Sequence, residues 1–258
     1  MANGSYFIGI DVGTSSAKAV LINGGGEVLV VSAPEYDFQT PKPLWAESNP
    51  EDWYAATVQA IREVVSEAGV ETVDAIGLTG QMHGLVLLDA EGEVLRPCIM
   101  WNDQRTAAEC SELTEGVGAE RVLQITGNPI LPGFTAPKIR WVEKNEPEVF
   151  SKIAHILLPK DYIRYRLTGA FATDVADASG MSLLDVGARQ WSDEMVEACH
   201  VQPEWLPELF ESAEVSARIS RAGAEATGLS EGIPVAAGAG DQAAQAVGSG
   251  IIEEGRLS

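Results

Sequence analysis

The sequence predicts an α/β domain with a mixed β-sheet and with helices inserted between its strands. The first ninety residues read as short apolar runs separated by glycine turns, with one amphipathic helix among them. The segment from about residue 103 to 228 is mainly helical, and a strand and a glycine turn return near residue 238. We find no repeat of fixed period and no linker-like stretch. A single domain over residues 1–258 is therefore expected.

The chain begins with a predicted three-stranded meander. Its apolar runs are Tyr6–Val12, Ala17–Ile22 and Glu27–Ser32. The intervening segments, Gly13–Ser16 and Gly24–Gly26, carry the glycines that tight turns between antiparallel strands require. These runs therefore form consecutive strands of one sheet.

A helix is predicted to follow the meander. Asn49 suits an N-cap, Pro50 suits the first helical position, and Gly69 is a typical C-terminal stop. Between them, apolar side chains recur at helical spacing and define one buried face. Two further strands then follow, at Val73–Thr79 and Leu85–Asp89.

The remaining elements are predicted from periodicity and turn residues. They are helices at Asp103–Leu113, Pro137–Asn145, Asp161–Leu167 and Asp193–Cys199, a strand at Ile233–Gly238, a turn at Gly238–Asp241 and a helix start at Gln242–Val247.

The charge balance excludes several classes of partner. Lys and Arg number 17 and Asp and Glu number 38, which gives a net charge of −21. Such a chain repels nucleic-acid backbones and anionic membrane surfaces, so neither is expected as a partner. No run approaches the ~18 apolar residues of a membrane helix, and the first residues lack a secretory pattern. With three scattered cysteines, a cytoplasmic location is expected.

A candidate phosphate and metal site lies at the end of the first predicted strand. Asp11 precedes a loop of Gly13, Thr14, Ser15 and Ser16. A carboxylate beside exposed backbone N–H groups and hydroxyls suits a magnesium ion and the phosphates that it bridges. Taken alone, these residues fit a plain hairpin turn better, and that alternative stays open.

Asp241 occupies a matching position near the end of the chain. A carboxylate at a strand end, among residues as small as Gly240 and Ala243, has room beside it for a substrate hydroxyl. It could accept the hydroxyl proton as a general base. A helix N-cap is an equally good interpretation from these residues alone.

Two polar segments are candidates for binding a sugar. Gln81–Gly84 lies between two predicted strands, and Trp101–Arg105 is a polar cluster around one aromatic. Tryptophan faces commonly pack against sugar rings, whereas amides, carboxylates and histidine satisfy sugar hydroxyls. The alternatives are a structural His83, and a helix start with a surface ion pair for Asp103 and Arg105.

The sequence resembles the FGGY family of carbohydrate kinases, and is most similar to its xylulose kinases. The segments that carry this resemblance occur in the family's order from about Phe7 onward: FIGIDVGTSSAKAVLI, QMHG, MWNDQR, TAPKIRWVEKNEP, LLPKDYIRYRLTG, DASGMSLLDV and GAGDQAAQAVGSG. The resemblance implies an actin-like (ribonuclease H-like) fold.

It also implies ATP and Mg²⁺ as cofactors and a ketopentose, D-xylulose, as the substrate that becomes D-xylulose 5-phosphate. Asp241 would be the catalytic base, Asp11 the residue that holds magnesium, and the loop from Gly13 through Thr14 and Ser15 to Ser16 would face the phosphates. The sugar pocket implied by the resemblance comprises Met82, His83, Trp101, Asp241 and Gln242.

Two departures from the family pattern widen the alternatives. Many xylulose kinases have Asn where this chain has Gln242, so ribulose, fuculose, gluconate and glycerol remain alternative substrates. The family also has a second actin-like domain, which would begin about where this sequence ends. The missing C-terminal domain would be a partner, and the chain alone is expected to be weakly active or inactive. A non-catalytic sugar-binding half, an actin-like chaperone ATPase and a homodimer stay open.

Overall fold

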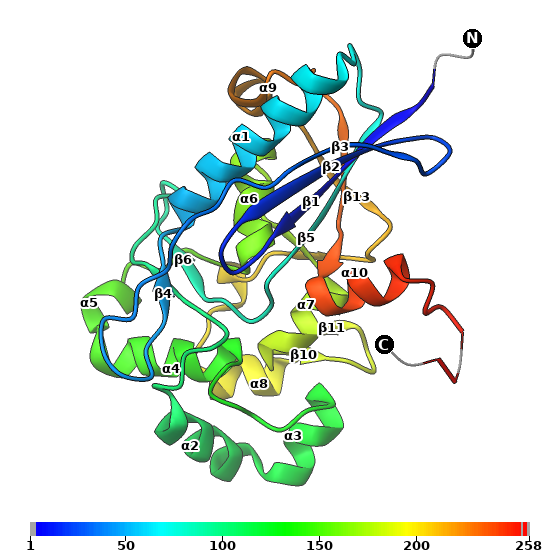
Figure 1. Ribbon diagram of the computed structural model, residues 1–258. Coiled ribbons are helices and arrows are strands. Elements are labelled where there is room, and N and C mark those ends of the chain that lie inside the picture. The colour runs from blue at the N-terminus through cyan, green and yellow to red at the C-terminus, as the bar shows by residue number, and fades with distance from the viewer. Residues whose placement is uncertain (1–3, 254, 257–258) are drawn as a thin grey trace.

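The computed structural model describes residues 4–253 and 255–256. Its centre is a mixed β-sheet that contains β1, β2, β3, β5 and β13 (Figure 1). The sheet has seven strands, of which six follow the order β13-β14-β5-β1-β2-β3, while β15 pairs with β5. These strands are β1 (Tyr6–Val12), β2 (Ala17–Asn23), β3 (Val28–Ser32), β5 (Ala75–Gly80), β13 (Val215–Arg218), β14 (Pro234–Ala236) and β15 (Ala239–Gly240). The predicted α/β class with a mixed sheet is confirmed.

The register of the sheet brings distant parts of the chain to one edge. β1 is antiparallel to β2 but parallel to β5, and β14 and β15 are also parallel to β5. Val12 lies opposite Gly80, and Gly80 lies opposite Gly240. The carboxyl ends of β1, β5 and β15 therefore meet, which is where open α/β sheets usually bind ligands.

One face of the sheet is covered by α1 (Pro50–Ala68), α6 (Pro159–Thr168) and α9 (Arg221–Thr227) (Figure 1). The caps predicted for α1 are confirmed. Asn49 Oδ1 accepts a hydrogen bond from the backbone N–H of Glu51 over 3.3 Å, and Gly69 has a left-handed φ of 62°. The fully buried Trp53 is the largest side chain on the covered face.

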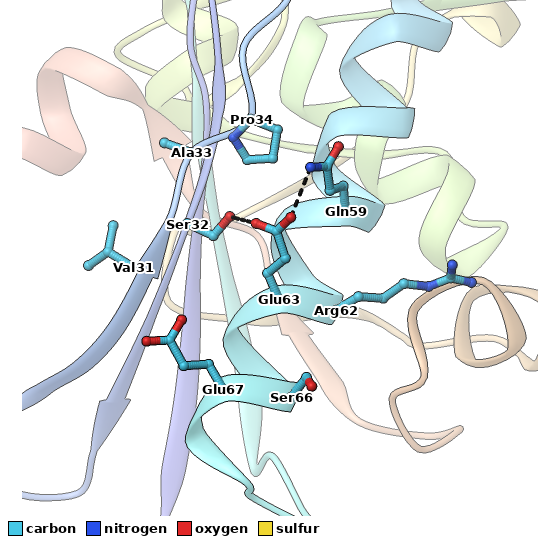
Figure 2. Close-up of a pocket in the computed structure, with 9 residues that line it drawn as sticks. All are labelled: Val31, Ser32, Ala33, Pro34, Gln59, Arg62, Glu63, Ser66 and Glu67. Atoms are coloured by element: carbon cyan, nitrogen blue, oxygen red, sulfur yellow. Dashed lines mark hydrogen bonds between the residues drawn. The ribbon is translucent and has the colours of Figure 1, made fainter.

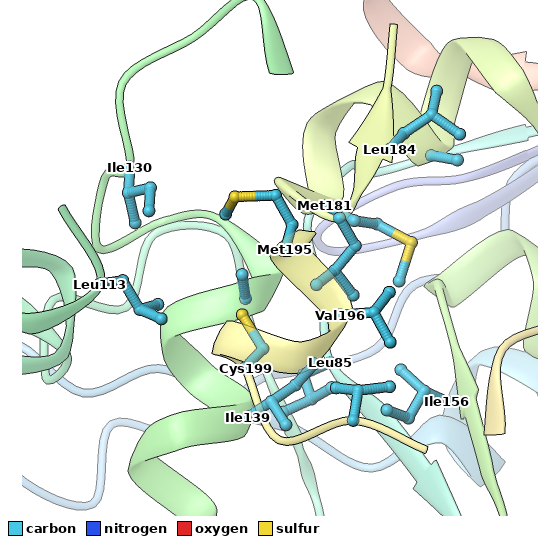
Figure 3. Close-up of a cluster of buried hydrophobic side chains, with 14 of the residues drawn as sticks. Leu85, Leu113, Ile130, Ile139, Ile156, Met181, Leu184, Met195, Val196 and Cys199 are labelled. Atoms are coloured by element: carbon cyan, nitrogen blue, oxygen red, sulfur yellow. The ribbon is translucent and has the colours of Figure 1, made fainter. Parts of the chain in front are cut away.

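A second apolar cluster forms the core of the helical part of the chain (Figure 3). It includes Leu85, which directly precedes β6, Ile156 from β8, and Ile139, Met181 and Met195 from helical segments. The helices of this part are α2 (Ala107–Val117), α3 (Ala119–Thr126), α4 (Thr135–Asn145), α5 (Pro147–Phe150), α7 (Val175–Ala178) and α8 (Asp193–Ala198), with 3₁₀ turns η1 (Ser179–Met181) and η2 (Pro203–Trp205). Its short strands are β4 (Glu47–Ser48), β6 (Val86–Leu88), β7 (Cys98–Ile99), β8 (His155–Leu157), β9 (Ala172–Asp174), β10 (Leu184–Asp185), β11 (Gln190–Trp191) and β12 (Glu208–Phe210).

Two boundary predictions are wrong for local reasons. The helix expected from Asp103 begins at Ala107, because the Asp103 carboxylate accepts hydrogen bonds from the backbone of Ala46 and from Arg105. The segment expected to be only a turn before Asp241 contains β15, and α10 (Asp241–Gly248) starts directly after it. None of the helices in the described part of the chain combines the length and hydrophobicity needed to cross a membrane.

Candidate active site

A cavity of about 250 Å³ opens where the carboxyl ends of the parallel strands meet. Its walls come from four segments that are far apart in the sequence: the β1–β2 turn, the segment after β5, the segment after β7, and the start of α10. The lining residues are Thr14, Met82, His83, Trp101, Asp241 and Gln242. The structure thus brings together all five residues predicted for the sugar pocket and one residue predicted for the phosphate loop.

Asp241 is the first residue of α10 and stands at the wall of this cavity. Its predecessor Gly240 is packed so tightly that a Cβ there would lie 2.7 Å from Met82 Cγ. Asp241 Oδ1 accepts a 2.7 Å hydrogen bond from the backbone N–H of Gln242, and Gly240 is the N-cap residue. Burial raises the pKa of Asp241, while its bonds from Gln242 oppose the rise. The second carboxylate oxygen can therefore receive a proton from a bound hydroxyl.

Asp11 lies near the end of β1, and its Oδ1 atom is buried without a hydrogen-bond partner in the described part of the chain. Burial raises the pKa of Asp11, Lys18 counteracts this, and the negative charge of Asp241 raises it further. An unpartnered carboxylate oxygen just before the Gly13–Ser16 turn could bind a divalent cation. Among the described residues no group of three His, Cys, Asp or Glu side chains could enclose a metal, so phosphate and water oxygens would complete the coordination.

The Gly13–Ser16 segment is a hairpin turn, as the alternative interpretation expected, closed by a 2.9 Å hydrogen bond from Gly13 N to Ser16 O. Two side chains hold it from outside. Tyr36 Oη donates to the carbonyl of Gly13 over 2.7 Å, and Gln81 Nε2 donates to the same carbonyl over 3.1 Å. Tyr36 does not belong to any sequence motif from which this contact could have been predicted. Its place follows only from the fold, which lays its segment against the turn.

His83 is held in a defined state beside the cavity. Its Nδ1 lies 2.7 Å from the carbonyl oxygen of Gly180 and its ring stacks on Phe134 with centroids 4.4 Å apart. Because a carbonyl only accepts, Nδ1 carries the proton, and burial lowers the pKa of His83 so that the ring is neutral. Nε2 is then free to accept a hydrogen bond from a ligand hydroxyl. Sequence reasoning missed Gly180 and Phe134, since both lie far from His83 in the chain.

The Trp101–Arg105 segment divides between two roles. Trp101 is 46% exposed and lines the cavity. Asp103 and Arg105 instead form a buried ion pair of 2.7 Å, and Arg105 also bonds Glu47 at 2.8 Å. Neither lines the cavity, and the interpretation of a surface ion pair is wrong because both side chains are almost completely enclosed.

Larger cavities lie elsewhere, and their lining differs. A groove between β3 and α1 contains Glu63, which accepts hydrogen bonds from Ser32 and Gln59, and none of the predicted site residues lines it (Figure 2). A second cavity of about 890 Å³ lies on the sheet face beside α10 and is mainly apolar, although Asp11 and Lys18 also line it. The smaller cavity is therefore the one where titratable and hydrogen-bonding groups converge.

Comparison with known proteins adds independent information. The N-terminal domain profile of the FGGY family of carbohydrate kinases matches residues 6–248. Xylulose kinase of Escherichia coli strain K12 is 47% identical over 247 residues, which are 96% of this chain and 50% of that protein. The crystal structure of xylulose kinase from Rhodospirillum rubrum superposes with a TM-score of 0.94 at 33% identity, over 97% of this chain and 52% of that one. Gluconate kinase from Lactobacillus acidophilus gives a TM-score of 0.87 at 27% identity, over 93% and 48%. The chain spans about half the length of the curated relatives that it matches.

Proposed function

The chain belongs to the FGGY family of carbohydrate kinases, and we propose that the complete protein uses it to transfer the γ-phosphoryl group of ATP to D-xylulose. The product would be D-xylulose 5-phosphate, and the catalytic base Asp241 would belong to this part of the protein. The observation that carries the proposal is the convergence of Asp241, His83 and Trp101 on one cavity beside the β1–β2 turn.

In the proposed reaction the terminal hydroxyl of the sugar lies against the free oxygen of Asp241. Asp241 accepts the hydroxyl proton as the sugar oxygen bonds to the γ-phosphorus of ATP and the bond from phosphorus to the ADP oxygen breaks. Asp11, with its buried unpartnered oxygen, would hold the Mg²⁺ that neutralises charge on the phosphates. The backbone N–H groups and hydroxyls of Gly13, Thr14, Ser15 and Ser16 would face those phosphates.

The sugar would be bound by groups with distinct chemistry. His83 offers an unprotonated Nε2 as an acceptor, and Trp101 offers a partly exposed aromatic face. Gln242 adds an amide that can both donate and accept hydrogen bonds. Met82 adds an apolar side chain to the lining of the cavity. This mixture suits a polyhydroxylated ligand rather than an apolar one.

We further propose that a second domain completes the nucleotide site. The parallel strands β1 and β5 expose Gly9 and Gly77 on the sheet face opposite α1, and the large apolar cavity lies on that face. Parallel strands are normally covered on both faces. The additional length of the relatives would supply such a cover.

A kinase for a related sugar is the second candidate. The similarity to a gluconate kinase favours it, since one fold with small changes in a few hydroxyl contacts accepts different sugars.

The test measures ADP release by the complete protein with D-xylulose, D-ribulose, L-fuculose, gluconate and glycerol, each with saturating ATP and Mg²⁺. The highest kcat/KM for D-xylulose is expected. A higher kcat/KM for another sugar would identify that sugar as the substrate and would leave the assignment as a carbohydrate kinase unchanged. Sugar binding without ADP release from any of them would leave only a binding module.

A further inference from the structure

Lys138 is a buried charged residue that the proposed function does not use. It lies in the first half of α4, and its side chain is completely inaccessible to solvent. In the described part of the chain no carboxylate lies within ion-pair distance of Nζ. Its hydrogen bonds run instead to two backbone carbonyls, that of His83 over 2.8 Å and that of Gly133 over 2.7 Å.

Burying the amine of Lys138 in the core costs desolvation free energy. Burial lowers the pKa of Lys138 to about 7, and the nearby thiol of Cys98 and the carboxylate of Asp103 oppose this only in part. An unbranched apolar side chain would occupy the same volume without the desolvation penalty. The two carbonyl contacts are therefore the feature that distinguishes lysine at this position.

The first carbonyl belongs to the residue whose ring lines the cavity. His83 has a left-handed φ of 66°, a conformation that non-glycine residues hold only when their surroundings enforce it. Its carbonyl also accepts a 3.1 Å bond from Thr135 Oγ1, and its ring stacks on Phe134. Phe134, Thr135 and Lys138, at the N-cap and in the first turn of α4, thus all contact His83.

The second carbonyl belongs to a segment packed on the other aromatic residue of the cavity. A Cβ on Gly133 would lie 2.6 Å from the backbone oxygen of Trp101, so the two backbones are in direct contact. Lys138 therefore connects the backbone of His83 to a segment that abuts the backbone of Trp101.

We propose that Lys138 is a positioning residue for the sugar site. By bonding the carbonyls of His83 and Gly133, it sets the spacing between the imidazole and the indole that line the cavity. This inference rests on the proposed function, in which both rings bind the sugar.

The kinetic test uses the complete protein with Lys138→Met, which substitutes an unbranched apolar side chain of similar size and removes both hydrogen bonds. The KM for the sugar should rise about tenfold or more, because the hydroxyl acceptor and the stacking face no longer fit one ligand. The KM for ATP should rise less than the KM for the sugar, because Lys138 reaches the phosphate loop only indirectly, through Trp101 and its bond to Thr14. Lys144→Met on the same helix is the matched control, since Lys144 pairs with Glu112 outside the cavity, and its sugar KM should be unchanged.

Thr135 provides an independent test should Lys138→Met fail to fold. Thr135→Val should raise the sugar KM in the same direction, and Thr135→Ser, which keeps the hydroxyl, should restore it. An unchanged sugar KM in folded Lys138→Met, or in Thr135→Val when Lys138→Met does not fold, would overturn the inference and leave the kinase function intact.

A spectroscopic readout separates the inference from the function. The imidazole nitrogen shifts of His83, assigned with a His83→Gln variant, should report an Nδ1–H tautomer in the wild-type protein and a mixture of tautomers in Lys138→Met. If the wild-type protein phosphorylates none of the sugars, the proposed function fails, and this measurement still decides the positioning role. An identical tautomer in both proteins would rule that role out.

Discussion

The indole Nε1 of Trp101 donates a hydrogen bond to Oγ1 of Thr14 over 3.1 Å. This contact joins the candidate sugar pocket to the candidate phosphate loop. Because Thr14 Oγ1 accepts from the indole, its own proton remains available for another acceptor in the cavity. A phosphoryl oxygen would be such an acceptor, so the sugar pocket and the phosphate loop should not act independently.

A double-mutant cycle tests this connection. In the complete protein, Trp101→Phe removes the indole donor and Thr14→Val removes the acceptor. Their effects on kcat/KM should couple by about 0.5–1.5 kcal/mol, the usual net value of one hydrogen bond. Ser15→Ala combined with Trp101→Phe is the control, since Ser15 neighbours Thr14 in the same loop, and that pair should be additive. Additive effects for Trp101 and Thr14 as well would show that the contact has no role in catalysis.

Replacement of Asp241 by Asn should abolish most of the activity. Asn retains the size of the side chain but cannot accept the hydroxyl proton, so kcat should fall by about 10²–10⁴. Steady-state kinetics of the complete protein checks this. Asp193→Asn is a matched control, because Asp193 is also the first residue of a helix but lies away from the cavity, and kcat should not change. A decrease of less than about tenfold for Asp241→Asn would exclude a general base at this position.

His83 should make sugar binding depend on pH. Protonation would place a hydrogen on Nε2 and remove the acceptor for a sugar hydroxyl. Burial lowers the pKa of His83 below its ordinary value, so the sugar KM should be constant near neutrality and should rise only as pH falls through that lowered pKa. His83→Ala should raise the sugar KM by the equivalent of about 1–3 kcal/mol and abolish this acid-side rise. If the sugar KM of His83→Ala still rose as the pH fell, the acid-side rise would belong to a group other than His83.

Gly180 should not tolerate even alanine. A Cβ at this position would lie 2.5 Å from His83 Cε1, so the methyl group must push the imidazole away from its carbonyl partner. The sugar KM of Gly180→Ala should therefore rise toward that of His83→Ala. Gly116→Ala in α2 is the control, because a Cβ there meets no atom within 4 Å, and its kinetics should match the wild type. Unaltered sugar binding in Gly180→Ala would mean that His83 is not held by this contact.

Lys138 should give the fold a characteristic pH dependence. Its pKa of about 7 in the folded protein is below the ordinary 10.5 of an unfolded lysine. Between these values the unfolded chain binds a proton that the folded chain does not, so the stability contributed at this position rises with pH. The unfolding free energy of the wild type minus that of Lys138→Met should therefore increase from about pH 7 to about pH 10. Below about pH 7 this difference should be constant.

Urea unfolding at several pH values measures this difference, in which the other titrating groups cancel. Lys144→Met serves as the control and should show no such rise, since Lys144 is partly exposed and its pKa is raised by Glu112. A constant difference for Lys138→Met would mean that Lys138 keeps an ordinary pKa in the folded protein.

Local chemistry explains which elements the sequence predicts well. The predicted bounds of the three meander strands and of α1 agree with the structure within one or two residues. The reason is that glycine turns and the Asn49 and Gly69 caps act within a few residues of chain. The helix expected from Asp103 begins four residues later, at Ala107, because the Asp103 carboxylate accepts a hydrogen bond from the backbone N–H of Ala46. No sequence pattern near Asp103 contains that information.

The sequence by itself determined the α/β class, the elements that begin and end in local signals, and the candidate residues for binding a phosphate or a sugar. It also carries the ordered motifs through which the family resemblance was found. These properties depend on residue type, short spacing and local backbone preferences.

Only the tertiary structure decided which of those residues meet and what holds them. The parallel pairing of β1, β5 and β15 places Asp11, the segment of His83 and Asp241 at one edge. The contacts of Lys138 and Gly180 with His83 span 55 and 97 residues. Such contacts arise from strand register and core packing, which are summed over the whole chain, and so no local stretch of sequence specifies them.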